Sequence, residues 1–168
     1  MAAAARKLLE SKIKILHSYG FKYRLMQRAH RDANGNTNGH GSRRILVVDD
    51  FRDSADAVAL CFEVMGYSTK AAYGGVSALE LADSWKPDSV ILDIMMPDLS
   101  GFDVAARLRN RPATAQALLV AYTAANTPTD YEQAELAGFD ALCEKPADPF
   151  QLALLLQRLA APVQIGEG

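Results

Sequence analysis

The chain has 168 residues, of which 49% are hydrophobic and 23% are charged, as expected for one globular domain with an appendage. This composition excludes a mostly disordered chain, a collagen-like chain and a disulfide-rich miniprotein. No apolar run approaches the roughly 18 residues that span a membrane. The two cysteines, Cys61 and Cys143, both lie in apolar stretches, so we expect buried, reduced thiols in a cytoplasmic protein.

The net charge of −2 conceals two oppositely charged parts. Residues 1–44 carry ten basic and two acidic side chains, whereas residues 45–168 carry eight basic and eighteen acidic ones. Residues 34–42 contain three glycines and no apolar side chain, which is typical of a flexible linker. We expect no direct DNA binding by the acidic part, because phosphate attraction needs a positive face. The expected organisation is a basic amphipathic N-terminal extension (1–33), a linker (34–42), one domain (43–160) and a C-terminal tail (161–168).

Short apolar runs alternate with helical patterns after the linker. The runs lack polar alternation, which is typical of parallel strands that helices cover on both faces. The expected strands are 45–48, 67–72, 89–92, 117–121 and 140–143.

The segments between these runs have helical signals. In the first, Leu60, Cys61 and Val64 recur at helical spacing. Later, Thr127-Pro128 has the pattern of an N-cap followed by proline at the first helical position. The expected helices are 53–65, 75–85, 102–108, 127–137 and 149–159.

Alternating strands and helices predict an α/β fold, a doubly wound five-stranded parallel sheet. Such sheets bind ligands beyond the carboxyl ends of their strands. Four of the five expected strands end in polar residues, and only the strand 67–72 does not. The flavodoxin-like order 2-1-3-4-5 puts that strand at an edge and makes the polar ends neighbours. The polar residues at these ends are Asp49, Asp50, Asp93, Thr123 and Lys145.

Three carboxylates at one edge of a sheet repel one another and need a proton or a cation. Oxygen ligands suit Mg²⁺, which typically binds one or two carboxylates together with a phosphate. Lys145 adds a positive charge and Thr123 a hydroxyl, so the group suits a phosphoryl ligand. The domain contains no histidine and no Walker-type glycine-rich loop. A carboxylate is therefore the expected nucleophile, and its product is an acyl phosphate.

The ordered set of these motifs resembles the receiver domain of response regulators in bacterial two-component signalling. One of the motifs alone would be weak, but the set follows the expected order and spacing through residues 45–160. The resemblance rests on residues 47–50, residues 92–97 with Ser100-Gly101, Thr123-Ala124 and Lys145-Pro146.

The resemblance implies a Mg²⁺ site. Its ligands would be the carboxylates of Asp49, Asp50 and Asp93 together with the backbone carbonyl of Met95. The metal would lie beside the residue that the resemblance implies is phosphorylated, Asp93.

The resemblance also implies a phosphorelay role. Asp93 would accept a phosphoryl group from a phosphohistidine on a sensor histidine kinase or a histidine phosphotransfer domain. Thr123 would supply the hydroxyl that moves to the phosphoryl group, and Lys145 would contact it, with Lys145-Pro146 in the cis form. Such a domain assists its own phosphorylation and dephosphorylation but is not a dedicated enzyme.

Two positions depart from the family pattern. Leu142 occupies the position of the usual tyrosine or phenylalanine, whose ring rotates inward on activation, and Ser100 replaces the usual aspartate or asparagine. The leucine leaves open an alternative function, a pseudo-receiver that is never phosphorylated and acts as an interaction scaffold. A phosphatase of the haloacid dehalogenase type is a weaker alternative, because that family has an aspartate where Met95 stands.

The expected output is a changed protein contact. Only eight residues follow position 160, which predicts a single-domain regulator with an unidentified downstream protein partner. Family members commonly use the face formed by the helix 127–137, the last strand and the last helix. This helix carries Asp130, Glu132 and Glu135 and no basic residue, so the face should favour a basic partner.

The N-terminal extension has a basic amphipathic pattern. Apolar residues such as Leu9, Tyr23 and Met26 recur at helical spacing through residues 2–31, interrupted at Gly20. A weakly ordered tail, and a helix that binds a partner or the acidic domain, both fit this pattern. Adsorption to an anionic membrane surface, nucleic-acid contact and an organelle-type leader are further alternatives.

Overall fold

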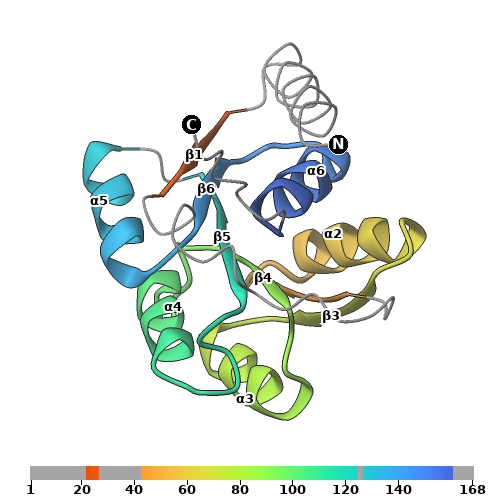
Figure 1. Cartoon of the computed structure of the whole chain (residues 1–168), viewed down its shortest axis with the longest axis horizontal. Helices are drawn as coiled ribbons and strands as arrows, with labels where there is room; N and C mark the ends of the chain where they lie inside the picture. The colour runs from red at the N-terminus through yellow and green to blue at the C-terminus, as the bar shows by residue number, and fades with distance from the viewer. Residues whose placement is uncertain (1–21, 27–42, 125–126, 161–168) are drawn as a thin grey trace, which may run out of the picture.

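The computed structural model describes residues 22–26, 43–124 and 127–160, which form one six-stranded sheet with helices on both faces (Figure 1). The predicted linker 34–42, the tail 161–168 and most of the extension 1–33 lie outside the described residues. The strands are β1 (Tyr23–Leu25), β2 (Arg44–Val48), β3 (Ser68–Ala72), β4 (Ser89–Leu92), β5 (Leu118–Thr123) and β6 (Ala141–Glu144). The helices are α2 (Arg52–Val64), α3 (Gly75–Trp85), α4 (Gly101–Arg109), α5 (Pro128–Ala137) and α6 (Pro149–Ala160).

The five predicted strands are confirmed, and they pair in the predicted order. The sheet runs β1-β6-β5-β4-β2-β3, and the strands from β2 to β6 are mutually parallel. β2 lies between β3 and β4, which leaves β3 at one edge. The carboxyl ends of β2, β4, β5 and β6 therefore lie side by side, as the fold class requires.

The strand β1 was not predicted, and it corrects the helical interpretation for residues 23–25; the rest of that pattern lies outside the described residues. Tyr23, Arg24 and Leu25 pair antiparallel with Cys143, Leu142 and Ala141 of β6. Without this partner, β6 would leave a row of backbone groups unpaired at the edge of the sheet. Tyr23 and Met26, three positions apart, pack against the cores on opposite faces of the sheet. Both can be apolar because helices cover both faces, so their spacing does not require a helix.

Alternation along the strands fills one core on each face of the sheet. In β2, Leu46 and Val48 point to the core beneath α3, α4 and α5, whereas Ile45 and Val47 point to the core beneath α2 and α6. Successive strand residues point to opposite faces, and both faces here are covered. Among the described residues, no helix combines the length and the apolar character needed to cross a bilayer.

The predicted apolar face of α2 is wrong, although the helix itself is confirmed. Leu60 and Val64 are 59% and 81% exposed, and Cys61 is exposed as well. The face that packs on the sheet contains Phe62, whose side chain is completely buried. This segment has two sets of apolar residues at helical spacing, on different faces of the helix. The sequence pattern does not distinguish them, and only packing against the sheet decides which face is buried.

The two cysteines differ in accessibility, and this difference gives a first prediction. Burial, and secondarily the charge of Glu144, raise the pKa of the Cys143 thiol to about 12. Iodoacetamide at mildly alkaline pH should therefore label only Cys61 in the folded protein and both thiols in guanidinium. Intact mass measures the number of labels, and a Cys61→Ser variant, which should remain unlabelled when folded, is the control. Rapid double labelling of folded protein would contradict the burial of Cys143.

Candidate functional site

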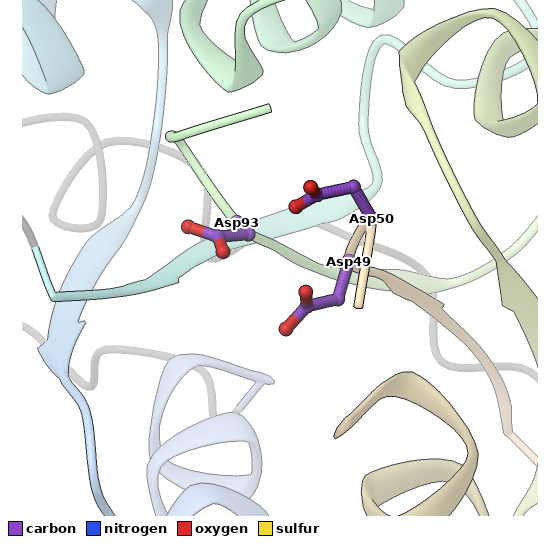
Figure 2. A group of neighbouring side chains, drawn as sticks. All are labelled: Asp49, Asp50 and Asp93. Atoms are coloured by element: carbon purple, nitrogen blue, oxygen red, sulfur yellow. The ribbon is translucent and has the colours of Figure 1, made fainter. Parts of the chain in front are cut away.

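Three carboxylates meet at the carboxyl ends of two neighbouring strands. Asp49 and Asp50 directly follow β2, and Asp93 follows β4, which pairs with β2. One carboxylate oxygen from each residue lies within 4.8 Å of the others, and Figure 2 shows the three side chains grouped there. Asp49 and Asp93 are buried, whereas Asp50 is exposed. The group is therefore an acidic site with one side open to solvent.

Lys145 lies between the two buried carboxylates. It follows β6, and its Nζ lies 2.6 Å from Asp49 Oδ2 and 2.9 Å from Asp93 Oδ2. Its backbone amide donates to the carbonyl of Thr123 at 2.9 Å. The ammonium group thus compensates part of the negative charge that the three carboxylates concentrate here.

The ionised states of this cluster are held by hydrogen bonds. Burial by itself raises the pKa of Asp49, but hydrogen bonds from Lys145, the Phe51 amide and the Ser54 hydroxyl outweigh it, so this pKa lies below its ordinary value. Burial likewise opposes the charge of Lys145, but Asp49 and Asp93 raise the pKa of its ammonium group above the ordinary value. Lysine and carboxylate therefore both remain charged at neutral pH.

The loop after Asp93 is held close to the Asp93 carboxylate. The Met95 amide donates to Asp93 Oδ1 at 3.1 Å, while the Met95 side chain is 67% exposed. At Gly101, any side chain would collide with the Asp93 carbonyl, so this position requires glycine. The adjacent Ser100 is the N-cap of α4 and accepts from the Asp103 amide at 3.2 Å. Serine at this position is therefore explained by capping.

Thr123 ends β5 and is completely buried. Its backbone contacts the amide of Lys145, and it lies opposite Glu144 in the sheet register. The structure thus brings Asp49, Asp93 and Lys145 into contact through their side chains, with Asp50 beside them. Thr123 joins them through its backbone.

Asp98 contributes to this part of the structure and was not predicted from the sequence. Its carboxylate accepts from the amides of Gly75 and Val76, both at 3.2 Å, and these bonds hold its pKa below the ordinary value. The residue before α3 is Gly74, which has no side chain to cap the helix. Asp98 supplies the cap from the loop after Asp93 and so ties that loop to α3. The only sign of this cap in the sequence is the glycine at position 74, which leaves the start of α3 without a capping side chain of its own.

Leu142, which differs from the aromatic residue usual in the family, lies in the interior of the domain. The side chain is 1% exposed and belongs to the core beneath α3, α4 and α5. Its backbone lies between β5 and the extra strand β1, opposite Arg24. Leu142 is therefore a packed core residue in this structure.

Comparison with known proteins agrees with this geometry. Residues 45–157 match the sequence model of the response regulator receiver domain. The chain belongs to this family. The Lys145–Pro146 bond is cis, as the family resemblance implies.

Relatives with curated descriptions include the response regulator MprA of Mycobacterium tuberculosis, which is 36% identical over 121 residues. The aligned part covers 71% of this chain and 50% of that protein. MprA of Mycobacterium avium is also 36% identical, over 119 residues. The chain thus spans about half the length of the curated relatives it matches.

Solved structures share the fold. The chemotaxis protein CheY4 of Vibrio cholerae superposes with a TM-score of 0.68 at 25% identity, covering 71% of this chain and 99% of that protein. The receiver domain of a DNA-binding response regulator from Colwellia psychrerythraea gives 0.64 at 29% identity, covering 70% and 98%. Proteins described with different outputs therefore have this fold.

Proposed function

We propose that this domain accepts a phosphoryl group on Asp93 from a phosphohistidine and signals through changed protein contacts. The observation that supports the proposal most strongly is the contact of Lys145 with both Asp49 and Asp93, beside the third carboxylate of Asp50. Three acidic groups with one lysine at strand ends form a site for an anion held through a divalent cation. The phosphohistidine donor would be a sensor histidine kinase or a phosphotransfer domain, which places the chain in the cytoplasm.

The donor set fits Mg²⁺. Asp49, Asp50 and Asp93 offer carboxylate oxygens, and the Met95 carbonyl is a further oxygen on the same loop. All are hard ligands of the kind Mg²⁺ prefers, and the exposed Asp50 leaves a path for the hydrated ion. When bound, the ion would neutralise charge that develops on the transferred phosphoryl group.

Residues of the chain itself carry out the attack on phosphorus and stabilise the transferred group. A carboxylate oxygen of Asp93 forms the new bond to phosphorus as the phosphorus–nitrogen bond of the donor breaks. The leaving imidazole keeps that electron pair and takes a proton from solvent. Lys145 donates to the oxygens of the transferred group, and Thr123 offers its hydroxyl at the neighbouring strand end. These residues assist transfer to and from Asp93, so the domain acts as a phosphoacceptor and not as a dedicated enzyme.

A second candidate is an interaction scaffold of the same fold that is never phosphorylated. Leu142 favours it, because this buried leucine has neither the ring nor the hydroxyl of the aromatic residue usual in the family. Contact with a separate downstream protein is part of the proposal.

The test is the intact mass after incubation with Mg²⁺ and acetyl phosphate. Wild type should gain one phosphoryl group, whereas Asp93→Asn should gain none, since the amide is a far weaker nucleophile than the carboxylate. Chelation of Mg²⁺ should also prevent the adduct on wild type. If wild type gains no adduct, even from a kinase-borne phosphohistidine, the scaffold function is favoured. An adduct on Asp93→Asn would move the acceptor to another residue.

A further inference from the structure

The strand β1 closes the edge of the sheet along the whole of β6. Beyond the three residue pairs, the Glu144 amide donates to the Lys22 carbonyl at 3.0 Å, and the Met26 amide donates to the Asp140 carbonyl at 2.9 Å. β6 is therefore paired on both sides, with β5 on one side and β1 on the other. In Figure 1, β1 lies beside β6 between α5 and α6.

Side chains fasten β1 on both faces of the sheet. Arg158 of α6 donates to the Tyr23 hydroxyl at 2.6 Å, and the Arg24 guanidinium lies 5.0 Å from the centre of the Tyr131 ring on α5. Met26 is 2% exposed within the core beneath α3, α4 and α5. Tyr23 and Leu25 pack against the core beneath α2 and α6, and a partly exposed ion pair joins Lys22 Nζ to Glu144 Oε1 at 3.5 Å. Three residues of regular pairing and these few contacts make a small docking surface, which a modest change in free energy can open.

β6 connects this docking surface to the acceptor site. Its last residue, Glu144, pairs with Lys22 on one side and with Thr123 on the other. The next residue, Lys145, reaches Asp49 and Asp93. Any displacement of the Lys145 backbone is therefore transmitted through one peptide bond to the residue that β1 holds.

We propose that the docking of β1 onto β6 is coupled to the state of Asp93, so that phosphorylation releases β1. The inference rests on the function proposed above. In the unphosphorylated protein, Lys145 is shared between Asp49 and Asp93. A phosphoryl group on Asp93 moves the negative charge outward, and Lys145 must follow it to keep the new anion neutralised. That movement displaces the end of β6 from the position that β1 pairs with. Because coupling between two sites is reciprocal, docking of β1 should in turn disfavour the phosphorylated state.

Cys143 is a built-in probe of this release. It lies opposite Tyr23 in the register and is completely buried, so a thiol reagent reaches it only when the structure opens. In a Cys61→Ser background, Cys143 is the single thiol of the chain. Its rate of labelling by iodoacetamide measures opening, while the intact mass of the same sample measures phosphorylation.

The expected result is that phosphorylation by acetyl phosphate and Mg²⁺ speeds labelling of Cys143 by about fivefold or more, the lower end of coupling between linked sites. The same treatment of a Cys61→Ser, Asp93→Asn double variant should change nothing. Amide hydrogen exchange should locate the opening at residues 22–26 and 140–144. A sample that is phosphorylated but labels at the unphosphorylated rate would overturn the proposal. A sample that gains no phosphoryl group would instead count against the function proposed above.

Substitutions at Arg24 give an independent test. Arg24→Pro removes a backbone donor from β1 and should undock the strand, whereas Arg24→Ala removes only the contact with Tyr131. In the Cys61→Ser background, the proline variant should label rapidly without phosphorylation, and phosphorylation should add little. If circular dichroism shows that the proline variant is folded, and its Cys143 is labelled as slowly as that of Arg24→Ala, the proposal is wrong. If the proline variant does not fold, the comparison of phosphorylated and unphosphorylated protein decides alone.

Discussion

Replacement of Lys145 by methionine should lower the rate of Asp93 phosphorylation by about 100-fold or more, the effect of removing one donor that stabilises developing negative charge. The Nζ of Lys145 lies 2.6 Å from Asp49 and 2.9 Å from Asp93. Methionine retains much of the length of the chain but removes the ammonium group. The carboxylates then lose their counter-charge, and the pKa of Asp49 should rise because its lysine partner is absent. Intact mass after timed incubation with acetyl phosphate and Mg²⁺ measures the rate.

Lys70→Met is the matched control for this prediction. Lys70 is an exposed lysine on β3, the strand without a polar end, and it packs 5.3 Å from the ring of Trp85. Its loss removes the same charge from the molecule without touching the acidic site, so the rate should stay close to that of wild type. If both variants are phosphorylated at the rate of wild type, Lys145 has no part in the transfer.

Replacement of Arg109 by methionine should cost about 3–5 kcal/mol of folding free energy, the usual effect of leaving one partner of a buried ion pair alone. Arg109 Nη2 lies 2.8 Å from Asp140 Oδ2, and the two side chains are 10% and 7% exposed. Arg109 also donates to the carbonyls of Gly138, Ala115 and Ala117. Urea unfolding, followed by circular dichroism, measures the loss.

A double variant separates the buried charge from the lost packing. Asp140 also accepts from the Leu119 amide at 2.8 Å, a bond that an asparagine can keep through its carbonyl oxygen. Arg109→Met with Asp140→Asn should therefore be more stable than Arg109→Met alone. A double variant less stable than the single one would show that the uncompensated charge is not the cause.

The exposed pair Arg111–Asp83 provides the comparison. Its nitrogen and oxygen lie 2.5 Å apart, but the side chains are 33% and 53% exposed. Arg111→Met should cost about 1 kcal/mol or less, because solvent screens such pairs. A loss as large as that of Arg109→Met would mean that hydrogen bonds from the guanidinium group to backbone carbonyls, which Arg111 also makes at Leu79, and not burial of charge, determine both effects.

Much of the acidic site could be predicted from the sequence because its determinants are local. Each strand is a short apolar run followed at once by its polar residue, as with Leu92 and Asp93. Parallel strands in one sheet bring such ends to the same edge, whatever the details of packing. The meeting of Asp49, Asp93 and Lys145 followed from that rule. The cap supplied by Asp98 did not follow from it, because Asp98 lies within a loop and not at a strand end, so no rule of the fold places it against the first turn of α3.

The sequence by itself determined the order and type of the five predicted strands and their helices, and the positions of the acidic residues. These depend on hydrophobic period and on breaker residues, which act over a few positions. Only the tertiary structure decided which stripe of α2 is buried, and it selected Phe62 over Leu60. It alone also decided that Tyr23–Leu25 form a strand. The backbone of that segment can form hydrogen bonds either as a helix or as a strand. The unpaired edge of β6, more than a hundred residues away, selects the strand.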